Sequence, residues 1–342
     1  MHRVARLLAV IVALGLTVAA CADDESLDGM SITVLTHDSF VISEEALAAF
    51  TAQTGISVSI QTLGDTGTMV SEAILTVGNP LGDVMFGIDN TFLQRGLDAD
   101  LFEAYESTNL GGVRAGLDLD AEHRVTPIDF GDVCVNYWID AVPHGNPTSL
   151  KDLTDPANAG QLVVENPETS SPGLAFLLAT IAATPDWEQY WTDLVENGVS
   201  VTSGWEEAYY GEFVAGGGNR SMVVSYASSP AAEVFFAAEP MDAAPTGVLL
   251  DSCFRQIEFA GVLAGAQNTA GAGAFIDFLL TPRFQEEIPL SMFVFPALEA
   301  AKLPQEFLDH AQLADSPHLL APAEIEANRD AWLDRWVEIV LR

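Results

Sequence analysis

Two aromatic side chains and a pair of hydroxyls in residues 201–233 could together hold a flat, positively charged small molecule. Trp205 opens a helical pattern, Tyr226 ends an apolar run, and Ser228 and Ser229 follow at once. An aromatic face attracts a cation by about 0.5–2 kcal/mol, and hydroxyls add the few polar contacts that orient a ligand. The alternative is that both aromatics are ordinary core residues.

The elements around these residues must bring them together. We expect a helix over 205–213 and a buried strand over 221–226, which an apolar run of this length favours. Ligands of open α/β sheets bind in the crevice outside the carboxyl ends of the strands. We therefore expect Trp205 and Tyr226 at the ends of neighbouring strands, or just beyond them.

The chain before and after this stretch has an α/β pattern. Strands expected over 31–35, 56–62 and 83–87 alternate with helices over 44–54 and 69–76, which predicts a mostly parallel sheet. A strand over 124–138 makes the first crossing between two lobes, and a strand over 248–260 returns. A short strand over 291–295 and a final helix over 322–341 follow. A chain of 342 residues is too long for one compact core, so we expect two lobes.

The charge is strongly acidic, with 49 Asp and Glu against 13 Lys and Arg and a formal net charge of −36. A basic surface for nucleic acid cannot form easily on such a chain, which excludes nucleic acid as a partner. Acidity favours cationic ligands only weakly, because acidic surfaces also serve solubility.

The N-terminus has the pattern of an export signal. His2, Arg3 and Arg6 precede an apolar run that ends in Val-Ala-Ala-Cys21, so we interpret 1–20 as a signal peptide and 21–30 as a polar tether. Cleavage before Cys21 would leave this cysteine for a lipid. The alternative is a soluble secreted protein in which Cys21 is incidental. No second apolar segment is long enough to span a membrane, so we expect membrane attachment through the lipid only.

Cys134 and Cys253 both lie in strand-like runs. Outside the cytoplasm an even pair of cysteines favours a disulfide. Two unpaired buried thiols are the alternative.

Seven segments, in this order and spacing, resemble one known family, and the resemblance covers nearly the whole mature chain. They are Thr36–Phe40, Gly87–Asn90, Asp129–Gly131, Glu168–Leu174, Gly204–Tyr209, Val224–Pro230 and Ile288–Pro289. The chain is similar to the thiamine-binding proteins of bacterial ABC importers, within the two-lobed periplasmic-binding superfamily. The resemblance implies an α/β fold of periplasmic-binding-protein type II, with two lobes, a cleft and a strand hinge.

The resemblance also implies a division of the chain and its partners. We expect lobe 1 over 31–130 and 256–342, and lobe 2 over 131–255. The cleft would capture thiamine or its phosphates and deliver them to a permease with its own ATPase. We expect an exported, lipid-anchored monomer facing the periplasm or the extracellular side, with no cofactor, no metal and no catalytic role.

The ligand residues implied by the resemblance fall into groups. Asp65 and Thr66 would contact the aminopyrimidine or the cationic end, and Ser170 and Ser171 the hydroxyethyl or phosphate end. Ring faces and further polar groups would come from Trp205, Tyr226, Ala227, Ser228 and Ser229. Asp65 could instead only cap the helix that follows it, and Ser170 and Ser171 could be plain loop residues before a proline.

Three positions depart from the family. His37 and Phe293 stand where the family has an aromatic residue and a Trp, and Ala232 stands where it has a second Tyr. We keep His37 and Phe293 as ligand candidates in a cage that these changes make thinner.

Two other functions compete. A ferric-ion binding lipoprotein of the same fold would use paired phenolates such as Tyr209 and Tyr210, although adjacent residues of a helix point about 100° apart. A thiamine-degrading enzyme of this fold would need Cys134 as its nucleophile, yet no partner that lowers its pKa is evident.

Overall fold

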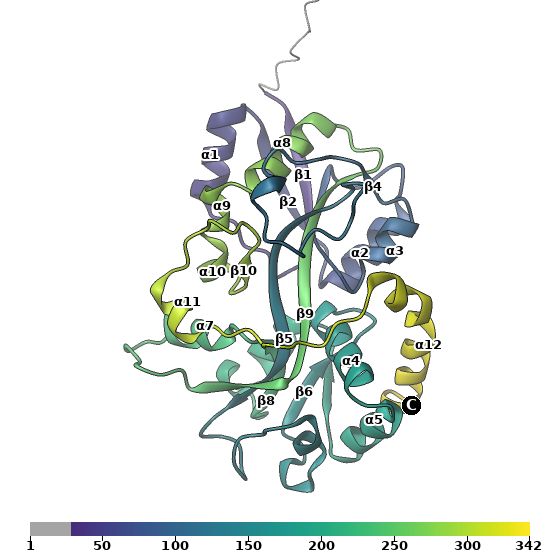
Figure 1. Cartoon of the computed structure of the whole chain (residues 1–342), viewed down its shortest axis with the longest axis vertical. Helices are drawn as coiled ribbons and strands as arrows, with labels where there is room; N and C mark the ends of the chain where they lie inside the picture. The colour runs from purple at the N-terminus through teal and green to yellow at the C-terminus, as the bar shows by residue number, and fades with distance from the viewer. Residues whose placement is uncertain (1–28) are drawn as a thin grey trace, which may run out of the picture.

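Two long antiparallel strands, β5 (Thr126–Trp138) and β9 (Thr246–Leu263), run through the molecule and join its two halves (Figure 1). The computed structural model describes residues 29–342. The expected signal peptide, the lipidation site Cys21 and most of the tether lie outside this range. Within it, no helix combines the length and the apolar content needed to cross a membrane.

The upper half in Figure 1 carries one end of the sheet. Its strands follow the order β2-β1-β3-β9, and β1 is parallel to both of its neighbours. These strands are β1 (Ser31–Thr36), β2 (Ser57–Thr62) and β3 (Val84–Asp89), with β4 (Phe102–Glu103) on β9 and β10 (Phe295–Pro296) on β5. The helices are α1 (Glu44–Thr54), α2 (Thr66–Leu75), α3 (Leu93–Asp98), α8 (Thr269–Leu279), α9 (Pro282–Gln285) and α10 (Ile288–Ser291).

The lower half continues the same sheet in the order β5-β8-β6-β7. Its strands are β6 (Leu162–Glu165), β7 (Ser200–Thr202) and β8 (Met222–Tyr226), and its helices are α4 (Ser171–Ala183), α5 (Trp187–Glu196), α6 (Trp205–Glu207) and α7 (Ser229–Phe235). The C-terminal segment packs α11 (Gln305–His310) on α7 and then α12 (Pro322–Val340) on α5 and α3. It therefore touches both halves (Figure 1).

Two large clusters of buried apolar residues stabilise the fold: one lies in the upper half, and the other runs through both halves. In the upper half Phe50 of α1 packs edge-on against Phe275 of α8, with ring centroids 5.2 Å apart. In the lower half Trp191 of α5 contacts both Phe176 of α4 and Trp336 of α12. The expected class, two α/β lobes joined by strands, is confirmed.

Three local expectations differ from the structure, the second of them only in part. The strands before Trp205 and Tyr226 are β7 and β8, which are not neighbours because β6 lies between them. In place of one regular helix over 205–213, the short α6 is followed by a π-helical segment over 208–212. The backbone of Phe213 is then extended. Residues 291–294 are not a strand: α10 ends at Ser291, and Phe293 has a positive φ of 55°.

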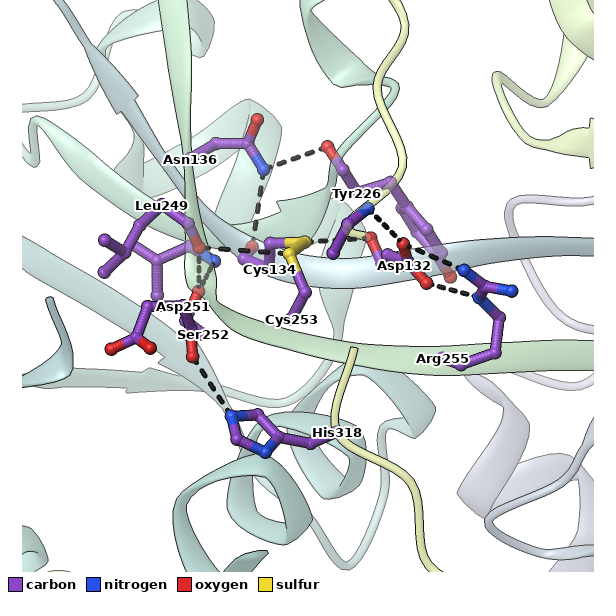
Figure 2. Close-up of a disulfide and its surroundings, with 12 residues drawn as sticks. Asp132, Cys134, Asn136, Tyr226, Leu249, Asp251, Ser252, Cys253, Arg255 and His318 are labelled. Atoms are coloured by element: carbon purple, nitrogen blue, oxygen red, sulfur yellow. Dashed lines mark hydrogen bonds and ion pairs between the residues drawn. A yellow bond between two sulfur atoms is a disulfide. The ribbon is translucent and has the colours of Figure 1, made fainter. Parts of the chain in front are cut away.

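The two hinge strands are covalently linked. Cys134 of β5 and Cys253 of β9 form a disulfide, with their Cα atoms 4.2 Å apart, as expected (Figure 2). It lies at an irregular part of the ladder, where the pairing jumps from Val133–Phe254 to Val135–Leu249. Close by, the buried Asp132 binds the Arg255 guanidinium. The strands that connect the lobes are therefore held together by a disulfide and an ion pair.

Candidate functional site

A cavity of about 290 Å³ lies in the cleft, with walls from both halves of the chain. Seven of the residues expected to bind ligand line it: His37, Asp65, Thr66, Trp205, Tyr226, Ser229 and Phe293. Its size is near the lower end of the roughly 300–1,000 Å³ typical of small-molecule pockets. The fold thus gathers residues that are up to 256 positions apart (Phe293 and His37) around one space.

Aromatic rings form one wall of the cavity. The Trp205 indole stacks on Tyr209 with ring centroids 5.0 Å apart, and Tyr226 meets it edge-on at 6.5 Å. The indole Nε1–H donates to Ser225 Oγ at 3.0 Å, and that oxygen lies 2.8 Å from Ser229 Oγ. Packing and this hydrogen bond fix the orientation of the indole, so the wall is preorganised for a flat ligand.

Asp65 joins the starts of three helices. Its carboxylate accepts from the backbone N–H of Thr66 at 2.6 Å, of Trp205 at 3.1 Å and of Ser171 at 3.3 Å. Thr66 belongs to the upper half, whereas Ser171 and Trp205 begin α4 and α6 of the lower half. Burial raises the pKa of Asp65, while these hydrogen bonds and those from Ser170 oppose the rise. Asp65 thus caps α2, which the sequence left open as an alternative to ligand binding, and it also bridges the cleft.

Three carboxylates lie side by side on the floor of the cleft. Asp89 of β3 and Asp129 of β5 each lie directly opposite Glu258 of β9, and Glu258 lines the cavity. Burial raises the pKa of Asp89 to about 6, and burial together with Glu258 raises that of Asp129 well above its usual value. We call these three residues the carboxylate row. Like charges directly opposite on a sheet are destabilising, so the row indicates a functional site.

His37 faces the carboxylate row. Its Nε2 lies 3.6 Å from Glu258 Oε1, and both side chains are about nine-tenths buried. Burial alone would lower the pKa of His37, but the carboxylates of Glu258, Asp65 and Asp38 together raise it above the usual value. The cavity therefore combines an aromatic wall with an acidic floor.

Comparison with known proteins shows to which family this chain belongs. The sequence pattern of the family described as bacterial extracellular solute-binding protein matches residues 79–314, more than half of the chain. This chain belongs to that family.

Several proteins similar to this chain are described as thiamine-binding periplasmic proteins. A thiamine-binding periplasmic protein of Brucella suis biovar 1 is 30% identical over 336 residues, or 96% of each chain. The solved structure of a periplasmic thiamin binding protein matches with a TM-score of 0.82 at 26% identity, over 91% of this chain and 96% of that one. A ferric binding protein from Campylobacter jejuni has a TM-score of 0.71 at 17% identity, over 90% and 99%, and shows the fold alone. Like its relatives, this exported solute-binding protein is a binding protein and not an enzyme.

Four expected ligand residues of the solute-binding protein do not line the cavity. Ser170 caps α4, and Ser171 donates its hydroxyl to Asp89 and accepts from Gln256 Nε2 at 2.8 Å. Ala227 donates its N–H to the Asp132 carbonyl at 2.8 Å, and Ser228 donates its hydroxyl to the Phe293 carbonyl. All four side chains are buried behind the wall, where they support it.

Other wall residues were not expected from the sequence. Glu258 and Gln256 lie on the cavity side of β9, and Glu206 follows Trp205 and accepts from Ser39 Oγ across the cleft at 3.2 Å. Alternating polar residues inside an otherwise apolar strand are a signal for such a face, and Gln256 and Glu258 have that spacing.

The residues that depart from the family pattern, His37, Phe293 and Ala232, all line the cavity. Phe293 adopts a left-handed backbone conformation, which is uncommon for a bulky residue, and its ring packs on Phe235 and Phe236. Ala232 lines the cavity as well. A small side chain at 232 leaves space where a second ring would lie.

The two competing functions depend on Tyr209 with Tyr210 and on Cys134. Tyr209 Oη donates to Glu233 at 2.5 Å, whereas Tyr210 is 55% exposed, so the two phenols have different surroundings. Over residues 29–342, no group of three or more His, Cys, Asp or Glu side chains could hold a metal ion. Cys134, the one candidate nucleophile, is consumed by the disulfide.

Proposed function

We propose that this solute-binding protein captures thiamine in its cleft and delivers it to an ABC permease with its own ATPase. The names of its relatives support this ligand, since thiamine is what they are described as binding. The proposal covers thiamine first and its phosphates second.

The observation that carries the proposal is the pairing of an aromatic wall with an acidic floor. Thiamine joins a flat aminopyrimidine to a permanently positive thiazolium ring. The lining offers the Trp205 and Tyr226 rings and the carboxylates of Asp65, Glu206 and Glu258. Among the lining residues in the part of the chain that the structure describes, His37 is the one basic side chain. A cation gains from both surfaces, by about 0.5–2 kcal/mol from an aromatic face alone.

Each end of the ligand has its own partners in the cavity. We assign the thiazolium to the space between the Trp205 face and the carboxylates, and the aminopyrimidine to Asp65 and Thr66, where a carboxylate can accept from its amino group. Ser229 and Tyr226 supply hydroxyls to the remaining polar edge. Phe293 closes the opposite side.

Thiamine phosphates fit this cleft less well. A phosphate is bound well by N–H groups at a helix start, yet the Ser171 N–H at the start of α4 already donates to the Asp65 carboxylate. A phosphate there would have to displace Asp65 and face its charge. We therefore propose that free thiamine binds more tightly than its monophosphate or diphosphate.

The cellular setting completes the proposal. A signal peptide over 1–20 is removed, Cys21 carries a lipid, and 21–30 tethers a monomeric receptor of two lobes, 31–130 with 256–342 and 131–255. Mass spectrometry of the membrane fraction tests the anchor: the wild type should carry a lipid on the peptide that starts at Cys21. Cys21→Ser should release the protein into the soluble fraction, and wild type that is unlipidated and soluble would contradict the anchor.

A calorimetric screen of the soluble domain, from residue 29 onward, tests the ligand. The probes are thiamine, its two phosphates, neutral hydroxymethylpyrimidine and ferric ion. We expect thiamine to bind most tightly, and ferric ion to give neither heat nor the visible colour of iron phenolates. Absence of thiamine binding would refute the proposed function, and a coloured ferric complex would favour the competing one.

A further inference from the structure

His37 occupies a position in the cleft where four carboxylates face it. Glu258 comes from β9, Asp65 from the start of α2, Asp38 from the loop after β1, and Glu206 from α6 across the cleft. Phe86 of β3 covers the imidazole from another side, with ring centroids 5.9 Å apart. His37 thus lies at the cavity end of the carboxylate row, with its Nε2 3.6 Å from Glu258 Oε1.

The backbone beneath His37 is shaped for the imidazole. Gly87 has a φ of +98°, and a Cβ atom there would lie 2.1 Å from His37 Cδ2. The imidazole therefore lies directly on the Gly87 backbone, and any larger residue at position 87 would force it out. Behind Glu258, both carboxylate oxygens of Asp129 are buried without a hydrogen-bond partner. Among the cavity-lining residues that the structure describes, His37 is the one basic side chain beside these acids.

We propose that His37 is the specificity-determining residue that couples capture of a cation to loss of a proton. Without ligand, the protonated imidazole balances Glu258 from its side of the cavity. The positive ring of the ligand then takes over this role, and the proton on the imidazole passes to solvent, leaving neutral His37 as a flat wall beside the ligand. This inference rests on the proposed function, because it needs a cationic ligand in this cavity.

The protonated imidazole of His37 and the positive ring of the ligand repel each other in this buried cavity. A like charge nearby in a buried site disfavours the charged form, so the bound cation lowers the affinity of His37 for its proton. By linkage, ligand binding then weakens by about tenfold per pH unit below the pKa of His37 in the free protein, and levels off above it. A neutral ligand of the same shape makes no such demand on His37.

Calorimetry in two buffers measures the proton directly. Thiamine is titrated in phosphate and in Tris between about pH 6.5 and 8.5, where histidine is the side chain that normally changes charge, and the difference in heat gives the protons released. We expect release approaching one proton at the acid end, falling towards zero at the alkaline end. Hydroxymethylpyrimidine, the neutral probe, should release none.

Matched variants assign the proton to its residue. His37→Gln should bind thiamine with an affinity that no longer depends on pH, without proton release, whereas the exposed His144→Gln should behave like the wild type. Release that persists in His37→Gln, or that disappears in Asp129→Asn while His37 is intact, would overturn the assignment. If His37→Gln does not fold, ¹⁵N-histidine NMR of the wild type replaces it: the His37 ring must change from protonated to neutral when thiamine binds, and an unchanged ring refutes the proposal. Wild type that binds no thiamine at any pH refutes the proposed function instead.

Discussion

The carboxylate of Asp65 accepts a hydrogen bond from the backbone N–H of Trp205 at 3.1 Å, across the cleft that separates the two halves of the chain. Nearby, Thr68 N–H donates to the Thr169 carbonyl at 3.3 Å over the same gap. Contacts of this kind require the two halves to lie against each other, as they do in this structure. We therefore expect hinge closure around a ligand to bring the aromatic wall and the acidic floor together.

Gly67→Ala should block this closure. A Cβ atom at Gly67, in the first turn of α2, would lie 2.7 Å from the backbone of Thr169 in the other half. The lobes would have to stay apart, so we expect thiamine affinity to fall at least tenfold, equivalent to about 1.4 kcal/mol. Calorimetry measures the affinity, and small-angle scattering checks whether thiamine still makes the protein more compact.

Gly111→Ala is the matched control. A Cβ atom there meets nothing within 4 Å, and Gly111 lies far along the chain from the cleft residues. Its affinity and compaction should equal those of the wild type. Equal affinity of Gly67→Ala and wild type would show that binding does not need the closed arrangement.

Trp205 should supply much of the binding energy. Trp205→Ala removes the ring that stacks on Tyr209, together with the indole N–H bond to Ser225, and we expect affinity to fall at least tenfold. Trp205→Phe keeps a ring face but loses that hydrogen bond, so its loss should be smaller. Calorimetry with thiamine ranks the three proteins. Unchanged affinity of Trp205→Ala would remove the aromatic wall from the binding site.

The disulfide between Cys134 and Cys253 should stabilise the hinge. It closes a loop of 119 residues, and constraint of so long a loop in the unfolded chain contributes roughly 2–4 kcal/mol. The double variant Cys134→Ser, Cys253→Ser should therefore melt several degrees lower than the oxidised wild type. A reducing agent should lower the melting temperature of the wild type and leave that of the variant unchanged. Equal melting temperatures in all conditions would contradict a stabilising disulfide.

Most of the lobe architecture could be predicted from the sequence, because local sequence signals agree with the tertiary structure. Helix α1 begins after Ser43, which caps it, and ends at Gly55 with a φ of 76°, so its bounds match the expected 44–54. Asp65 likewise caps α2, as a polar residue before a helical pattern predicts. Capping residues act on residues next to them in the chain, so their effect can be recognised from the sequence alone.

The acidic floor could not be predicted in the same way. Asp89, Glu258 and Asp129 lie far apart in the sequence and meet only because β9 pairs with β3 on one side and β5 on the other. The register of antiparallel strands depends on turns and packing that a single sequence does not fix. The position of Ser171 behind the wall has a related cause, because its hydroxyl is engaged by Asp89 and Gln256 from two different strands.

The unliganded protein should become more stable as the pH falls from about 7 to about 5. A carboxyl whose pKa is higher in the folded than in the unfolded chain binds more protons when folded, so acid favours folding. Burial raises the pKa of Asp89 to about 6, and it also raises those of Asp65, Asp129 and Glu165.

His37 acts in the same direction. Its pKa is raised above the unfolded value by Glu258 against the effect of burial, so its contribution is complete below the unfolded pKa and is lost as the pH rises through the folded one. The groups that oppose this trend, Asp120 and Asp152, have lowered pKa values and lose their contribution only below about pH 4. The protein should therefore gain stability between pH 7 and 5, and Asp89, with its pKa of about 6, should contribute about 1 kcal/mol of this gain.

Melting curves at several pH values, with and without thiamine, check this dependence. Asp129→Asn removes one buried carboxyl with little change in shape, so it should raise stability at neutral pH and flatten the dependence, whereas the exposed Asp118→Asn should leave it unchanged. Saturating thiamine should also flatten it, because the bound cation displaces the proton that we assign to His37. A melting temperature that falls on acidification towards pH 5, or a dependence that Asp129→Asn does not alter, would mean that the carboxylate row does not store the protons we assign to it.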